Sequence, residues 1–213
     1  MKSFIIHLPL INSSLESAIE TKKALHKIKI DAELFEGTYG KDAESLFTKE
    51  NRQVKFIEGV NLQTGKILYP GVKGCFYSHY RLWKKCSELN EPIMIFEDDV
   101  LVINNYKEIN FQEILILSIN YDWVVSDPWK KFLEEKNTLT TAQAYTSRFM
   151  PGASGYIIKP HAASKLLEIY KDSYLPTDVA INSEICKLEI HPQLIGRSKT
   201  MTEKESMTRR KHW

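Results

Sequence analysis

Three adjacent acidic residues, Glu97, Asp98 and Asp99, follow a short apolar run near the middle of the chain. The apolar residues 93–96 are typical of a central strand that is covered on both faces. Carboxylates crowded at a strand end repel one another and lose hydration, and a divalent cation removes both penalties. If strand geometry continues, Glu97 and Asp99 lie on one side and Asp98 points toward a backbone or basic partner. The cluster therefore indicates a Mg²⁺ or Mn²⁺ site that binds phosphates, with a solvated turn as the alternative.

The segments around this cluster alternate between strand and helix patterns, which predicts an α/β fold with three layers. Residues 41–70 are polar and irregular, and we interpret them as an excursion from the core. The predicted strands are residues 4–8, 30–35, 93–96, 123–125 and 153–158. The first predicted helix begins at Ser13 or Ser14 and runs to about residue 27. The other predicted helices cover residues 71–89, 161–170 and 178–188.

Composition excludes several classes of protein. The chain has 213 residues, of which 43% are hydrophobic and 26% are charged, so it can bury one sizeable core and is not intrinsically disordered. It lacks the stretch of about 20 apolar residues that spans a bilayer. Cys75, Cys86 and Cys186 include no Cys-x-x-Cys pair, which predicts reduced thiols, no structural zinc site and a cytoplasmic location.

The net charge of +2 is unevenly distributed along the chain. Residues 197–213 carry six Lys or Arg and two Glu, a charge of +4, which leaves −2 for residues 1–196. We therefore expect a single domain over residues 1–196 followed by a basic C-terminal segment. Short basic segments are most often solvated, and the alternative is binding to phosphate, nucleic acid or an anionic membrane.

Several short motifs occur in an order that points to a known family. The sequence Gly74-Cys75-Phe76-Tyr77-Ser78-His79 precedes the acidic cluster by one helix, and further motifs lie at residues 155–158, 162–167, 176–178 and 191–194. This order resembles the family 25 glycosyltransferases, which include lipopolysaccharide-biosynthesis galactosyltransferases and collagen galactosyltransferases. The resemblance covers most of the chain. Its most specific part is the Gly-Cys-x-x-Ser-His element followed by the apolar–Glu-Asp-Asp element.

The resemblance implies a GT-A (Rossmann-like) nucleotide-sugar-binding fold with a mostly parallel central sheet. It also implies a nucleoside-diphosphate-sugar donor, a Mn²⁺ or Mg²⁺ cofactor, and inversion at the anomeric carbon. By this resemblance Asp99 ligates the metal, and Glu97 holds the metal, its bound water or the donor ribose. The residues expected to contact the donor are Leu8, Pro9, Gly37, Lys73, Ser78, Glu97 and Asp98.

Two histidines each allow two interpretations. His191 could be a third metal ligand, because GT-A enzymes often use a later histidine, or a structural residue at a strand end. His79 follows Ser78, but adjacent helical residues point about 100° apart and make no nucleophile–base pair. We interpret His79 as a partly buried helix residue, with a donor contact as the alternative.

Two acids compete for the role of general base. Asp178 matches the family's later acidic position, and Asp127 follows another predicted strand. A carboxylate within reach of the acceptor hydroxyl can remove its proton. Trp129 and Gly155 are predicted on the acceptor side, since aromatic rings stack on sugars and glycine permits close backbone approach. The alternative for both is a purely structural role.

The acceptor is predicted to be a saccharide of the lipopolysaccharide type. A hydroxymethylated base in phage DNA is the alternative, supported by the compact chain, the missing membrane segment and the basic residues 209–213. Family members usually carry an arginine soon after the first strand, and residues 11–16 contain none. That departure supports a third possibility, a non-catalytic relative that binds nucleotide sugars. The sequence does not indicate an oligomeric state.

Overall fold

The computed structural model describes residues 1–55, 69–102, 105–118, 143–144, 148–150 and 153–197. Its strands are β1 (Lys2–His7), β2 (Ala32–Glu36), β3 (Gln53–Val54), β4 (Ile93–Glu97), β5 (Val100–Val102), β6 (Ile114–Ser118), β7 (Gln143–Ala144), β8 (Gly155–Ile158), β9 (Ser173–Tyr174) and β10 (Leu188–Arg197). Its helices are α1 (Asn12–Lys27), α2 (Gly40–Lys49), α3 (Pro70–Leu89), α5 (Pro160–Ile169) and α6 (Thr177–Ala180).

The main sheet has the strand order β2-β1-β4-β8-β6-β10-β5, and β7 pairs with β10. The pairings place β1, β2, β4, β6 and β10 in one direction and β5, β7 and β8 in the other. A small parallel pair, β3-β9, lies apart from this sheet. The predicted α/β fold with a mostly parallel central sheet is therefore confirmed.

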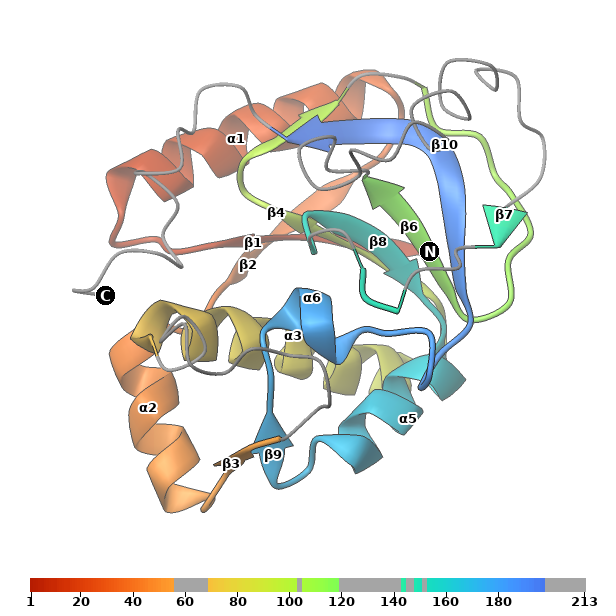
Figure 1. Cartoon of the computed structure of the whole chain (residues 1–213). Helices are drawn as coiled ribbons and strands as arrows, with labels where there is room; N and C mark the ends of the chain where they lie inside the picture. The colour runs from red at the N-terminus through yellow and green to blue at the C-terminus, as the bar shows by residue number, and fades with distance from the viewer. Residues whose placement is uncertain (56–68, 103–104, 119–142, 145–147, 151–152, 198–213) are drawn as a thin grey trace.

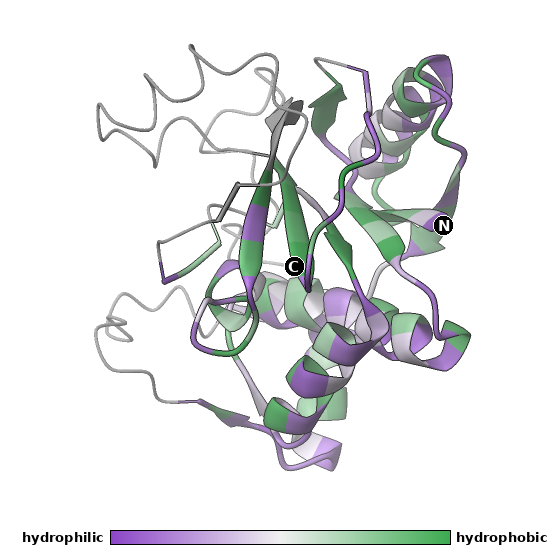
Figure 2. Cartoon of the chain, turned by 90° about the vertical axis from the view of Figure 1, so that its right-hand side faces the viewer, coloured by the Kyte–Doolittle hydropathy of each residue, from purple (hydrophilic) through white to green (hydrophobic). Residues whose placement is uncertain are grey.

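Helices cover the sheet on both faces, which gives the predicted three layers (Figure 1). α1 lies on one face, and α2, α3, α5 and α6 lie on the other. The four apolar residues of β4 are all buried: Ile93 and Ile95 pack with α3, whereas Met94 and Phe96 pack on the α1 side. Figure 2 shows the hydrophobic strands between the helices. Such two-sided burial explains why β4 is a continuous apolar run.

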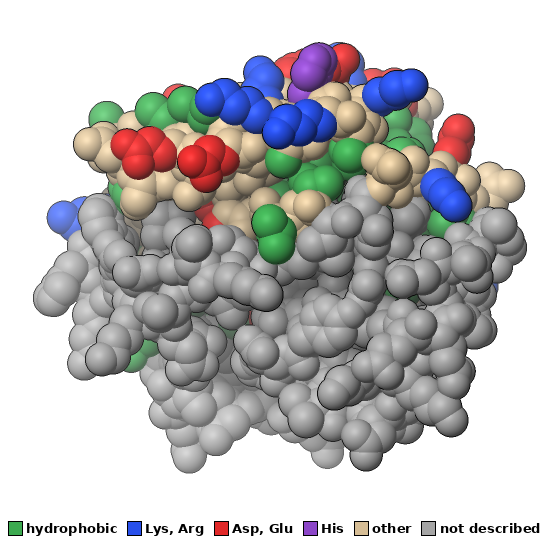
Figure 3. Space-filling view, turned by 90° about the horizontal axis from the view of Figure 1, so that it is seen from above, with side chains coloured by type: hydrophobic (Ala, Val, Ile, Leu, Met, Phe, Trp, Pro, Cys, Tyr) green, Lys and Arg blue, Asp and Glu red, His purple; other side chains and the backbone are tan. Residues whose placement is uncertain are grey.

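The outer face of α1 is polar. Its exposed residues include Glu16, Glu20, Lys22, Lys23 and Lys27. Figure 3, which views the molecule from above Figure 1, shows Lys, Arg, Asp and Glu side chains over the described part of this face. The helix therefore buries one stripe against the sheet and leaves the opposite stripe in solvent.

The start of α1 differs in detail from the prediction. The helix begins at Asn12, its N-cap residue is Ile11, and no side chain caps it. The Ser14 hydroxyl instead accepts a hydrogen bond from the Leu8 N–H at 2.9 Å and donates to the Asp98 carboxylate. Ser14 is fully buried, so its hydroxyl serves a tertiary contact in place of a helix cap.

The predicted helix over residues 178–188 is wrong. α6 ends at Ala180, and Ile181 is already extended. The Asn182 side-chain amide donates to the carbonyls of Val179 and Ala180 at 3.1 and 3.4 Å, and its oxygen accepts the Glu184 N–H. Asn side chains that bond to nearby backbone compete with helix hydrogen bonds, which explains the early end.

Some predictions fall outside the described residues. The predicted strand at 123–125 is one of them, and the basic segment is another except for Arg197, which ends β10. The division of the chain at residue 196 therefore stays a prediction. Among the helices that the structure describes, none combines the length and apolar character needed to cross a membrane.

The contact between α3 and the β2–α2 loop depends on the absence of a side chain at Gly74. A Cβ atom there would lie 2.5 Å from the Thr38 carbonyl oxygen and 3.0 Å from the Gly40 nitrogen. The Ser78 hydroxyl, one turn later on α3, donates to the Gly74 carbonyl at 2.7 Å and accepts the Thr38 N–H at 2.8 Å. Backbone packing and a polar bridge thus join this loop to α3.

Gly74→Ala should lower the free energy of unfolding by about 1–3 kcal/mol, because the new methyl group overpacks against the loop backbone. Helix propensity alone predicts the opposite sign, a gain of about 1 kcal/mol. Urea unfolding measures the difference. Lys84→Ala, on the exposed face of α3, is the control and should change stability by no more than about 0.5 kcal/mol. A stabilised Gly74→Ala protein would contradict the close approach.

Candidate functional site

The carboxyl ends of β1, β2 and β4 meet at one edge of the sheet. His7 pairs with Glu36, and Ile6 pairs with Glu97. The antiparallel β8 begins at the same edge, where Gly155 lies opposite Phe96. Ligands of open α/β sheets bind outside the carboxyl ends of the strands. This edge, with the acidic cluster on it, is therefore the candidate functional site.

Asp98 turns away from this edge into the α1 side of the sheet. Its carboxylate accepts the Ser14 hydroxyl, and its backbone carbonyl accepts the Thr21 hydroxyl at 2.8 Å. Only 5% of the residue is exposed. Burial raises the pKa of Asp98 to about 7, helped by the charges of Asp99 and Glu97 and opposed by the Ser14 hydrogen bond. The expected separation from Glu97 holds, and the carboxylate accepts the Ser14 hydroxyl and a backbone N–H and has no basic partner among these contacts.

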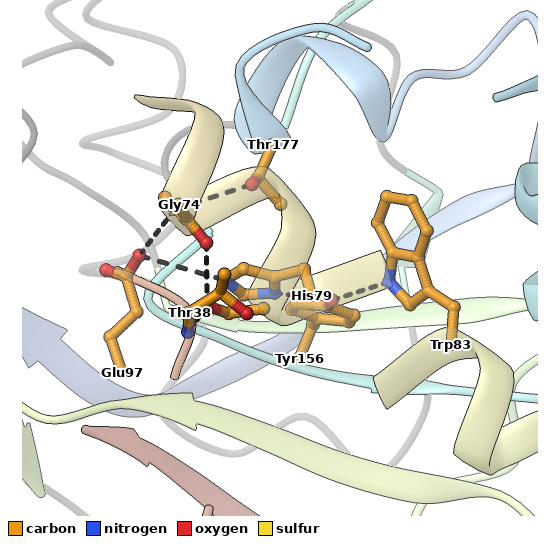
Figure 4. A network of polar contacts seen from close by, with 9 residues as sticks. Thr38, Gly74, His79, Trp83, Glu97, Tyr156 and Thr177 are labelled. Atoms are coloured by element: carbon orange, nitrogen blue, oxygen red, sulfur yellow. Dashed lines mark hydrogen bonds and ion pairs between the residues drawn. The ribbon is translucent and has the colours of Figure 1, made fainter. Parts of the chain in front are cut away.

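Glu97 points to the opposite side, toward α3 (Figure 4). Its Oε1 atom lies 3.9 Å from the Cys75 Sγ and 3.9 Å from the His79 Nε2. The side chain of Glu97 is 30% exposed, and that of His79 is 1% exposed. The Nε2 atom of His79 has no hydrogen-bond partner among the described residues. α3 thus presents a thiol and an imidazole to the first acid of the cluster.

A buried chain of hydrogen bonds contacts the Nδ1 atom of His79, the ring nitrogen that does not face Glu97 (Figure 4). The Tyr156 hydroxyl lies 2.9 Å from the His79 Nδ1 and accepts the Trp83 indole N–H at 2.8 Å. Tyr156 and Trp83 are fully buried. The interpretation of His79 as a buried helix residue fits this chain at Nδ1, but it does not account for the Nε2 atom that faces the site.

Asp178 lies in the first turn of α6, next to the same cluster. The neighbouring Thr177 hydroxyl is 3.5 Å from the Cys75 Sγ. Desolvation is the main cause that raises the pKa of Asp178 to about 6, and the charge of Glu97 adds to it. Backbone N–H groups of residues 178 and 179 and the charge of His79 act in the opposite direction. The charges of Glu97 and His79 therefore act on the pKa of Asp178, and its role as general base stays a prediction.

The residues expected to bind the donor differ in their burial and in their contacts. Leu8 and Pro9 follow β1 and are partly buried. The Gly37 N–H donates to the His7 carbonyl at 2.8 Å, and a Cβ at Gly37 would meet the Leu8 side chain at 3.2 Å. The Lys73 ammonium lies 2.7 Å from Glu44 on α2, so its charge already has a partner. These donor roles stay predictions.

Several predicted residues cannot be placed at the site. Asp127 and Trp129 lie outside the described residues. His191 lies in β10, but its side chain is outside the described part of the structure. The metal-binding role of Asp99 stays a prediction; the residue is partly buried in the turn between β4 and β5.

Three contributors to the site were not predicted as functional residues: Cys75, Tyr156 and Thr177. The four-residue spacing between Cys75 and His79 was the available signal, because it places both side chains on one helix face. Tyr156 gave no signal, since its contact with His79 joins residues 77 positions apart in the chain. Thr177 likewise reaches Cys75 only through the fold.

Comparisons with known proteins identify a family for this chain. The family described as Glycosyltransferase family 25 (LPS biosynthesis protein) matches residues 9–181. The lipooligosaccharide biosynthesis protein lex-1 of Haemophilus influenzae is 32% identical over 129 residues, 55% of this chain and 42% of that protein. Procollagen galactosyltransferase 1-A of Xenopus laevis is 28% identical over 153 residues, 68% of this chain and 25% of that protein. The matched segment thus spans less than half the length of either relative.

The buried Asp98 should make stability depend on pH. The native carboxyl keeps its proton up to about pH 7, whereas the unfolded one loses it near its ordinary pKa of 3.8. Between these values the native state binds more protons, so this group lowers stability as pH rises, by up to about 1.4 kcal/mol per pH unit. Asp98→Asn removes that contribution. The variant should therefore gain stability relative to the wild type between about pH 4 and pH 7.

Urea unfolding across this pH range, with a chelator present to remove divalent cations, measures the effect. Asp172→Asn changes an exposed acid and is the matched control, whose curve should run parallel to that of the wild type. A parallel curve for Asp98→Asn would contradict the raised pKa.

Proposed function

Because the chain belongs to glycosyltransferase family 25, we propose that it transfers a sugar from a nucleoside-diphosphate sugar to an acceptor hydroxyl, with inversion at the anomeric carbon. The observation that carries the proposal is the cluster of Glu97 and Asp178 at the edge where β1, β2 and β4 end. In one in-line displacement, the acceptor oxygen bonds to the anomeric carbon as the bond to the diphosphate oxygen breaks. Such a reaction needs a base on one side and a stabilised leaving group on the other.

The acids at this edge fit a divalent cation. Glu97 is partly exposed at the end of β4, and Asp99 follows two residues later. Burial is the main cause of the raised pKa of Asp98 and of Asp178, and the charge of Glu97 adds to both. A cation relieves this added repulsion. Carboxylate oxygens are the ligands that Mg²⁺ and Mn²⁺ prefer. We propose that Glu97 and Asp99 hold such an ion, which would neutralise charge on the diphosphate leaving group.

Asp178 is the proposed general base. A carboxyl with a pKa of about 6 is ionised at neutral pH yet is more basic than an ordinary aspartate. It would accept the proton of the acceptor hydroxyl as that oxygen attacks. Gly155, at the start of β8, borders the same edge, which supports an acceptor-side position for it.

We propose a saccharide as the acceptor. The name of one relative, the lex-1 protein, refers to lipooligosaccharide biosynthesis, which supports this choice. The alternative, a hydroxymethylated DNA base, was supported in part by the basic residues 209–213, which lie outside the described residues.

A donor-hydrolysis screen tests the proposed reaction class. Purified protein with Mn²⁺ and a panel of nucleoside-diphosphate sugars should release free nucleoside diphosphate from one donor, because many transferases slowly pass the sugar to water. Asp99→Ala should lose at least about 100-fold of this rate, as expected when the leaving-group charge is no longer neutralised. Donor binding without any turnover, with or without saccharide acceptors, would favour the non-catalytic alternative.

Asp178→Asn tests the proposed base. Transfer to the acceptor should fall by about 10²–10⁴-fold while donor affinity stays within a few-fold, because only proton removal is lost. The wild-type rate should fall as pH drops through the pKa of Asp178, which is about 6 without a bound cation and lower once a cation offsets the charge of Glu97. Asp172→Asn is the control. If Asp127→Asn abolishes transfer and Asp178→Asn does not, the base is Asp127.

A further inference from the structure

Cys75 and His79 form a pair on α3 that the proposed sugar transfer does not use. The Cys75 Sγ and the His79 Nε2 each lie 3.9 Å from the Glu97 Oε1. All three of these atoms lie within 4.8 Å of one another. We propose that Cys75, His79 and Glu97 bind a borderline-soft divalent cation, with Zn²⁺ as the preferred ion. This site shares Glu97 with the proposed Mn²⁺ or Mg²⁺ site, but it differs from that site because it includes a sulfur and a nitrogen ligand.

The spacing of the three atoms suits a tetrahedral ion. Zinc binds thiolate, imidazole and carboxylate ligands at about 2.0–2.3 Å, which places neighbouring ligand atoms roughly 3.3–3.8 Å apart. The two contacts at 3.9 Å therefore need only a small contraction. The third separation, between Sγ and Nε2, is within 4.8 Å and closes by up to about 1.5 Å when the ion binds. Cys75 and His79 are four residues apart on one helix, so the backbone already holds them on a common face. Three protein ligands leave one position for water.

The Nε2 atom of His79 is the second observation that points to a ligand. The residue is 1% exposed, and this nitrogen makes no hydrogen bond among the described residues. Its distance of 3.9 Å to Glu97 is too long for a hydrogen bond. Buried polar atoms are almost always paired, so a nitrogen left in this state and aimed at a thiol and a carboxylate calls for an explanation. A cation between the three side chains supplies one.

The surroundings of His79 match those of metal-bound histidines. When Nε2 binds a metal, Nδ1 carries the proton, and the Tyr156 hydroxyl oxygen lies 2.9 Å away to accept it. Such a partner fixes the tautomer and the ring orientation of the ligand. The Trp83 indole N–H also donates to this oxygen, at 2.8 Å, and so holds Tyr156 in place. Figure 4 shows the chain from Trp83 through Tyr156 and His79 to Glu97.

An ion can reach the site from the edge of the sheet. Cys75 is partly exposed, and 30% of the Glu97 side chain is exposed. Binding converts the Cys75 thiol to a thiolate, and its proton passes to solvent. Sulfur and imidazole ligands favour Zn²⁺ or Co²⁺ over Mg²⁺ or Mn²⁺. Because Glu97 belongs to both proposed sites, Zn²⁺ here would compete with the donor's cation for that carboxylate.

Cobalt titration of the purified, metal-stripped protein tests the site without requiring activity. Co²⁺ bound by a thiolate gains a sulfur-to-metal charge-transfer band in the near ultraviolet, which oxygen ligands do not produce. We expect this band to saturate at one ion per chain and to disappear when Zn²⁺ is added. Cys75→Ser should abolish the band, and His79→Gln should weaken Co²⁺ binding at least about tenfold. Cys86→Ala, which removes a buried thiol of the same helix, should leave both unchanged.

Asp99→Asn separates this site from the proposed catalytic cation. It should retain the thiolate band even where sugar transfer is lost, so the two proposals can fail independently. Circular dichroism checks that each variant is folded, and His79→Gln keeps the test decisive if Cys75→Ser does not fold. Co²⁺ binding without a thiolate band, or a band that survives Cys75→Ser or is unaffected by His79→Gln, would overturn the inference.

Discussion

The burial of the Asp98 carboxyl beneath α1 is the interaction on which the arrangement of the candidate site depends. One hydroxyl, that of Ser14, donates to this carboxylate and accepts the N–H of Leu8, so it ties together the end of β1, the first turn of α1 and the end of β4. Successive residues of a strand face opposite sides. Once Asp98 is held on the α1 side, Glu97 must face α3, where its carboxylate meets Cys75 and His79.

α3 faces this edge with two neighbouring stripes of residues, which make different contacts. Gly74 and Ser78 hold the helix against the backbone of the β2–α2 loop. Cys75 and His79, each one position later, face Glu97. The close approach at Gly74 therefore does more than fill space, because it sets how near the thiol and the imidazole come to the acid. The Gly-Cys-x-x-Ser-His element therefore combines two residues that pack against the β2–α2 loop with two polar residues that face Glu97.

The layers, the site edge and the strands β1, β2, β4 and β8 could be predicted from the sequence, because they depend on local periodicity and on acids that follow an apolar run. The other described strands were not predicted. The separation of Glu97 from Asp98 was predictable for the same reason. Contacts between distant parts of the chain were not predictable. Ser14 has the sequence features of a helix cap, and only the fold shows its contact with Asp98, 84 residues away. The early end of α6 depends on the side chain of Asn182, whose competition for backbone hydrogen bonds outweighs the helical pattern of the surrounding sequence.

Glu97 couples the groups around it through its charge. It raises the pKa of Asp98, Asp178 and Cys75, in each case after burial, which is the larger cause. A cation bound by Glu97 reverses the sign of the local field, since a bound divalent ion carries the largest charge in such a site. It would therefore favour the ionised form of Asp178 and the thiolate of Cys75. In the proposed reaction, the ion that neutralises the diphosphate would also keep the base deprotonated, so that loss of the ion weakens both halves of the displacement.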